Sequence, residues 1–107
     1  MGSFQAIANY ELLSALTGQM REAAMLDDWD RLIGIERQRS DLVESMKAVD
    51  AEAKLDAAER GRKARLIAQV MDADTEIRVR VQRWMGQLQH ELQSNRQEQR
   101  VLKAYGV

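Results

Sequence analysis

The residues that could carry out chemistry are led by two carboxylates that interrupt an apolar stripe. Asp74 and Glu91 occupy stripe positions but lie roughly 17 residues, or over four helical turns, apart. An acid–base pair must reach one reacting bond, so we do not expect these two side chains to form a catalytic pair. An acid in an apolar seam is better explained by pairing with an arginine or by fixing the register of packed helices.

Other side chains suited to catalysis or to metal binding are few. The chain has no cysteine, which excludes thiol catalysis, disulfides and thiolate metal sites. His90 is the single histidine, and its place beside the apolar stripe favours an ordinary surface or interface residue. The sequence has no glycine-rich phosphate loop, two-histidine metal pattern or Ser–His pairing. We therefore predict a protein that is not an enzyme and that needs no metal and no cofactor.

The charges divide along the chain. Residues 1–59 carry a net charge of −6 and residues 60–107 carry +5, within a total of −1. This division predicts an acidic N-terminal part packed beside a basic helix. The arginines of "ERGRKARL" and "EIRVRVQRW" could contact phosphate, but no aromatic platform for bases accompanies them. We expect no direct binding of nucleic acid.

Composition predicts an all-α, soluble protein. Proline is absent, helix formers dominate, and apolar residues never alternate with the period of a strand. No apolar run approaches the roughly 20 residues that cross a bilayer, and the first residues lack the form of a secretion signal. We expect a cytoplasmic protein without membrane insertion and a single helical-bundle domain over residues 1–107.

Two amphipathic helices are predicted before residue 50. The first runs from near Phe4 to Met25, and the second runs from "DDWD" at residues 27–30 to about Val49. Because the connection is short, the two helices should form an antiparallel hairpin. Arg39 interrupts the second stripe, where its aliphatic stem can pack while its guanidinium reaches water or an acid. The apolar stripes comprise Leu13, Leu16, Met20 and Ala23, then Leu32, Ile35, Leu42, Met46 and Val49.

The turn between these helices contains an unusual tryptophan. Asp27 and Asp28 suit a helix start, because a carboxylate there accepts hydrogen bonds from free backbone N–H groups. Trp29 follows them directly. We favour a structural role for its indole, covering the open end of the hairpin, over ligand binding.

A long third helix should begin at Asp56, whose spacing to Glu59 approximates a capping box. After Leu92 come eight polar residues, so either the helix continues into solvent or the chain turns back as a short fourth helix. The predicted architecture is thus an antiparallel hairpin packed on a long third helix, with a short C-terminal fourth helix as the alternative ending. The third-helix stripe comprises Ile67, Val70, Asp74, Ile77, Val81, Trp84, Leu88 and Glu91.

Three segments together resemble the FliT family of flagellar type III export chaperones. They are "DDWDRLIGIERQRSDLV", the helix "LIAQVMDADTEI" and the terminal "LKAYG". In FliT-like sequences an acidic-Trp-Asp segment opens the second helix, and a segment ending Ala-Tyr-Gly follows the third. This chain stops one residue after "AYG", where some members continue with an amphipathic segment that can cover the client surface.

The resemblance implies a cytoplasmic chaperone that binds the filament-cap protein, keeps it unassembled and delivers it to the export apparatus. Family members also contact the export ATPase and export-gate components, and some bind the master transcriptional activator of flagellar genes. A homodimer is left open. The residues implied in partner binding are Ile67, Val70, Met71, Ile77 and Tyr105.

The residues themselves indicate partner binding without identifying the partner. Met71 and Met85 flank a wide apolar stripe, and unbranched methionine adapts to varied partner surfaces. For each of these residues taken singly, packing in the core is the favoured explanation. The alternative function is a structural coiled-coil protein or a small helical regulator that has no export client.

Overall fold

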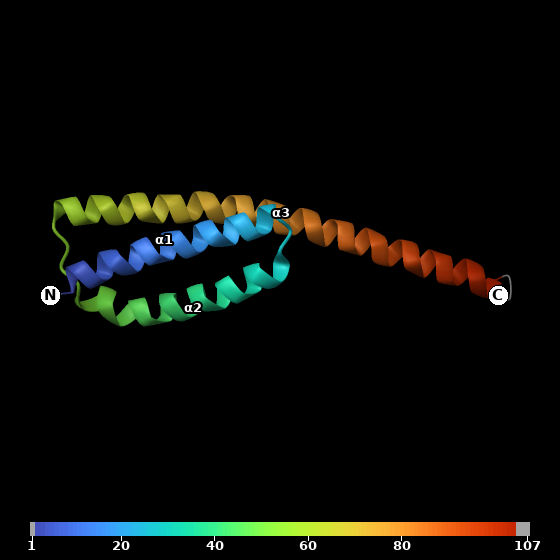
Figure 1. Ribbon diagram of the computed structural model, residues 1–107, viewed down its shortest axis with the longest axis horizontal. Helices are drawn as coiled ribbons and strands as arrows, with labels where there is room; N and C mark the ends of the chain where they lie inside the picture. Colours follow the sequence, from blue (N-terminus) through green and yellow to red (C-terminus); the bar gives the residue numbers. More distant parts are fainter. Residues whose placement is uncertain (1, 105–107) are drawn as a thin grey trace. The chain divides into compact units, whose positions relative to one another are not determined.

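The protein is built from three helices. The computed structural model describes residues 2–104, with side chains described as far as Gln93. The helices are α1 (Ser3–Met25), α2 (Trp29–Glu52) and α3 (Ala57–Ala104), and this described range contains no strand (Figure 1). The prediction of an all-α fold is confirmed. None of the described helices is both long enough and apolar enough to cross a membrane.

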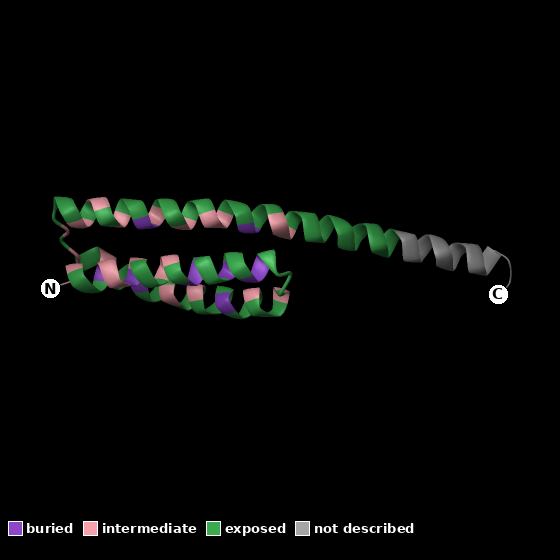
Figure 2. Ribbon diagram, turned by 45° about the horizontal axis from the view of Figure 1, so that its top comes forward, coloured by how far each residue is buried: buried purple, intermediate pink, exposed green. Residues whose placement is uncertain are grey.

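The chain divides between Ile77 and Arg78 into two compact units. The first unit holds α1, α2 and the beginning of α3, and the second holds the rest of α3. Almost all burial belongs to the first unit, whereas the described side chains after Val81 are exposed (Figure 2). The expectation of one domain over residues 1–107 stays a prediction.

The core of the first unit is centred on α1. This helix packs along α2 as the predicted antiparallel hairpin, and it also lies alongside the beginning of α3 (Figure 1). The predicted stripes are confirmed, because Leu16, Met20, Ile35 and Met46 are all buried. Small residues let the neighbouring helices approach α1 closely. The buried residues of α1 are Ala6, Asn9, Leu16, Thr17, Met20, Ala23 and Ala24.

The α1–α2 turn is closed by backbone hydrogen bonds at the end of α1. Asp27 N–H donates to Ala24 C=O at 3.1 Å and Asp28 N–H donates to Ala23 C=O at 2.9 Å. This is the Schellman pattern, and Asp27 takes the left-handed conformation that it requires, with φ at 55°.

Asp28 then begins α2. Its carboxylate accepts a hydrogen bond from the backbone N–H of Arg31 at 3.3 Å, which confirms the predicted cap. Trp29 is the first residue of α2 and is half-buried. Its position at the turn agrees with the predicted structural role, which stays a prediction.

The connection from α2 to α3 is short. α2 continues to Glu52, three residues beyond the predicted end, and ends where Ala53 adopts an extended backbone. The capping box at the start of α3 is confirmed. Glu59 N–H donates to the Asp56 carboxylate at 2.8 Å, and Asp56 N–H donates to the Glu59 carboxylate at 3.0 Å.

The predicted stripe of α3 was partly wrong about which side chains are buried. Leu66, which the stripe omitted, is only 3% exposed, and Ile77 is 7% exposed. Trp84 and Leu88, which the stripe included, are 37% and 41% exposed. The fourth helix is not confirmed, because α3 is a single helix as far as Ala104.

Candidate partner-binding site

A polar layer joins the middle of the three helices. Arg39 of α2 donates from Nη1 to the Asp74 carboxylate of α3 at 2.6 Å, and the same nitrogen lies 3.4 Å from Thr17 Oγ1 of α1. The arginine also pairs with Glu36 at 2.9 Å. The arginine pairing proposed for Asp74 is therefore confirmed. This layer links α1, α2 and α3 through a single arginine.

A second layer joins the helices around Tyr10. Its hydroxyl donates to the Asp50 carboxylate of α2 at 2.6 Å, and Nζ of Lys63 in α3 lies 5.1 Å from its ring centroid. Burial, followed by the hydrogen bond and the negative charge of Asp50, raises the pKa of Tyr10 to about 12. The phenol therefore stays protonated and donating throughout the physiological pH range.

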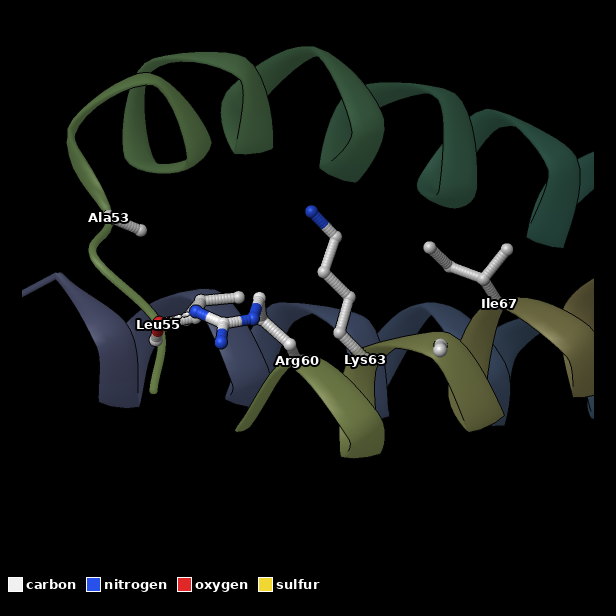
Figure 3. A pocket seen from close by; sticks show the side chains of 6 residues that line it. Ala53, Leu55, Arg60, Lys63 and Ile67 are labelled. Carbon is white, nitrogen blue, oxygen red and sulfur yellow. Dashed lines mark hydrogen bonds between the residues drawn. The ribbon is translucent and has the colours of Figure 1, made fainter. Parts of the chain in front are cut away.

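A pocket lies beside the Tyr10 layer, where α3 begins. Its volume is about 500 Å³. Figure 3 shows Lys63 and Ile67 extending from α3 toward α2, while Arg60 reaches back to the connection, where its Nη1 donates to Leu55 C=O at 2.8 Å. The pocket thus combines apolar walls with two cationic side chains. Its lining residues are Ala53, Leu55, Arg60, Lys63, Ala64 and Ile67.

The residues predicted to bind a partner fall into different environments. Ile67 lines the pocket and is half-buried, and Met71, one turn further along α3, is 63% exposed. Val70 is half-buried, whereas Ile77 belongs to the core of the first unit. Tyr105 lies outside the described residues. The structure therefore brings together Ile67 and Met71, with Val70 between them in the sequence.

Sequence reasoning missed the pocket itself. Two of its walls, Ala53 and Leu55, come from a connection that shows no clear helical period and contains neither proline nor glycine. The only available signal was the interruption of the apolar stripe at "DAEAKL". A sequence pattern of this kind shows where a helix ends, but it does not show that the chain leaves a cavity there.

The ion pairs between the hairpin and α3 run in both directions. Arg62 of α3 pairs with Glu11 of α1 at 3.6 Å, as the division of charge predicts. In contrast, Arg21 pairs with Glu76, and Arg39 pairs with Asp74. These two pairs join hairpin arginines to acids of α3. The described ion pairs therefore do not follow the net charges of the hairpin and of α3.

The first unit also exposes apolar side chains that no neighbouring helix covers. A few such residues are normal on a protein surface, but Met71 lies one helical turn from Ile67, which lines the pocket, so a partner that enters the pocket could also bury Met71. The described residues contain no cluster of His, Cys, Asp and Glu that could hold a metal ion. The large exposed apolar residues of the first unit are Phe4, Leu12, Met25, Leu26, Ile33, Val43 and Met71.

These features define a small helical protein whose pocket and exposed apolar side chains suit protein binding. The family model for the flagellar protein FliT matches residues 7–107, so the chain belongs to the FliT family. This is a family of cytoplasmic flagellar export chaperones, and the predicted resemblance is confirmed. No curated protein and no solved structure matches the chain.

Proposed function

We propose that the protein binds the flagellar filament-cap protein in the cytoplasm, keeps it unassembled and delivers it to the type III export apparatus. Membership of the FliT family supports this role. The observation that carries the proposal is the apolar surface formed by Ile67 and Met71 at the edge of the α3 pocket. We extend the partner set to the export ATPase, the export-gate components and the flagellar master transcriptional activator.

The physical basis is the burial of apolar surface by an amphipathic client helix. Met71 is largely exposed, so a partner can remove its side chain from water. Methionine has three rotatable side-chain bonds and adapts to the shape of the incoming helix. Ile67 supplies a stiffer contact at the pocket. The client therefore gains binding energy without displacing the Leu66 side chain from the core.

Titration calorimetry with a C-terminal fragment of the filament-cap protein tests the proposal. Changing Ile67 and Met71 together to serine should abolish complex formation and leave the helical circular dichroism spectrum unchanged. The matched control changes Arg65 and Asp72, two exposed polar residues of the same helix, to serine. This control should bind normally. A folded Ile67→Ser, Met71→Ser variant with unchanged affinity would place the client surface elsewhere.

A second candidate, a structural coiled-coil protein without a client, is favoured by the exposed apolar residues after Arg78. Such a stripe on a helix suits pairing with another copy of the chain. Light scattering of the purified protein distinguishes the two functions. A stable homodimer that does not bind the cap fragment would support the structural role. The apolar residues concerned are Val79, Trp84, Met85, Leu88 and Leu92.

A further inference from the structure

We infer that the α3 pocket recognises an acidic side chain of the client, an aspartate or glutamate adjacent to an apolar residue in one amphipathic helix. Lys63 and Arg60 bind the carboxylate, and the apolar walls beside Ile67 receive the neighbouring side chain. The inference rests on the proposed function and deepens it, because it names the chemistry that selects the client segment.

The size and composition of the pocket suit a client residue of this kind together with part of its helix. A cavity of about 500 Å³ is larger than any single side chain, so a client residue can enter together with part of its helix. Ala53, Ala64 and Ile67 offer apolar walls. In Figure 3 the Lys63 side chain extends between Ala53 and Ile67 toward α2, which places its ammonium group at the pocket rather than on the outer surface of α3.

The two cations have hydrogen-bonding capacity left for a ligand. Among the described residues, neither Arg60 nor Lys63 forms a salt bridge. Arg60 donates to Leu55 C=O, which uses one of the five N–H groups of a guanidinium. The described contact of Lys63 is with the face of the Tyr10 ring, which leaves its three N–H donors without an acceptor oxygen.

The nearby acids are engaged elsewhere. Asp50 accepts the hydroxyl of Tyr10, and the carboxylates of Asp56 and Glu59 accept backbone N–H groups in the capping box. None of these acids forms a salt bridge with Arg60 or Lys63, so a client carboxylate would not have to displace an existing ion pair. Electrostatic complementarity of this kind gives a binding site its specificity more than its total affinity.

The continuation of the apolar surface along α3 determines the kind of occupant. Ile67 lines the pocket, and Met71 continues the surface one helical turn further. A helix that lies along α3 can cover both residues, with an apolar side chain on Met71 and a carboxylate in the pocket. The inference assigns this carboxylate to a side chain within the helix, and amidation of the fragment's C-terminus tests the assignment against a chain terminus.

The test compares the cap-protein affinity of Lys63→Gln with that of Arg65→Gln, an exposed control that loses the same charge on the same helix. Loss of a charged hydrogen bond should weaken binding of the C-terminal cap fragment about tenfold in Lys63→Gln and leave Arg65→Gln unchanged. Ala64→Phe, which fills the pocket, should also weaken binding. Circular dichroism verifies that each variant is folded, and Lys63→Arg should retain most of the affinity.

Variants of the cap fragment identify the carboxylate. One Asp→Asn or Glu→Gln change in the fragment should weaken binding to the unchanged chain about tenfold but have a clearly smaller effect on Lys63→Gln, which keeps only the Arg60 contact to that carboxylate. Amidation of the fragment's C-terminus should have no effect. An effect of amidation, or the absence of any acid coupled to Lys63, would overturn the inference.

The outcomes separate this inference from the proposed function. If the unchanged chain does not bind the cap fragment, the proposed function and the inference both fail. If it binds, and Lys63→Gln binds as tightly as Arg65→Gln, only the inference fails. If Ala64→Phe dissociates a homodimer and leaves cap binding intact, the pocket serves a second copy of the chain and the inference is overturned.

Discussion

The two parts of α3, before and after Ile77, share a helical sequence pattern but differ in burial. In residues 57–77, Leu66 and Ile77 are almost completely buried in the three-helix unit. In residues 78–93, the large apolar side chains of the same helix remain exposed, except for Val81, which is half-buried. Periodicity therefore predicts where a helix forms and which residues share a face, whereas burial requires a neighbour to pack against that face.

The difference has an energetic consequence for the helix. A helical segment gains most of its stability from tertiary packing and little from intrinsic propensity. Residues 57–77 of α3 pack against α1, and the polar layers join them to α2. We therefore expect substitutions in residues 57–77 to change the free energy of unfolding strongly and equivalent substitutions in residues 78–93 to change it little.

The largest effect should come from shortening matched leucines. Leu66→Ala should lower the free energy of unfolding by about 2 to 5 kcal/mol, because it leaves a cavity in the core. Leu88→Ala should change it by less than about 0.5 kcal/mol, because its side chain is exposed and lies outside the core of the first unit. Urea denaturation followed by circular dichroism measures both. Equal losses in the two variants would remove the distinction between the two parts.

A smaller effect should separate the two stripe acids. Asp74→Ala should lower the free energy of unfolding by about 1 to 2 kcal/mol, because it leaves the partly buried Arg39 without its closest carboxylate. Glu91→Ala should change it by less than about 0.5 kcal/mol, because the residue is exposed. In Arg39→Met the cost of Asp74→Ala should nearly vanish. A persistent cost there would show that the ion pair is not the cause.

The smallest effect should come from the Tyr10 hydroxyl. Tyr10→Phe should lower the free energy of unfolding by about 1 kcal/mol at neutral pH, through loss of the hydrogen bond to Asp50. Because folding raises the pKa of Tyr10 from 10.0 to about 12, its contribution is complete below pH 10 and is lost as the pH rises through 12. Melting temperatures of both proteins between pH 9 and 12 should therefore converge. A constant difference would contradict the raised pKa.

Local features of the fold were predictable from sequence to within a few residues. The cap at Asp28 and the capping box of Asp56 and Glu59 depend only on neighbouring residues, and both form. The stripes of α1 and α2 were also correct, because each helix of a hairpin packs chiefly against the other. These are short-range patterns that chain geometry translates directly into structure.

The buried face of α3 was harder to predict. This helix packs against α1 and contacts α2, and the direction of its buried arc depends on how those two helices are placed. Leu66 is buried, and Gln69, three residues further along α3, accepts a hydrogen bond from Ser14 of α1, which indicates that this side of α3 faces α1. The three-and-four repeat counted from Ile67 selects residues next to that face and omits Leu66. The sequence pattern contained the period but not the position of the neighbours.

The candidate site divides in the same way. Ile67 and Met71 could be proposed from the sequence, because an apolar stripe with a flexible flank suits a partner helix. The pocket could not, since its walls come from the α2–α3 connection and from α3 together. Lys63 lies over the ring of Tyr10, about 50 residues earlier in the chain. A local sequence pattern could not show this contact, so it could not place the lysine at the pocket.

The Schellman turn between α1 and α2 also fixes the number of residues that can connect these two helices. Three residues, Leu26, Asp27 and Asp28, end one helix and begin the next, so none of them is a spare linker residue. One inserted residue would rotate α2 by about 100° about its own axis if the turn shifted as a unit. Ile35 and Met46 would then leave α1 together. Unlike most surface loops, this turn should tolerate substitution better than insertion or deletion.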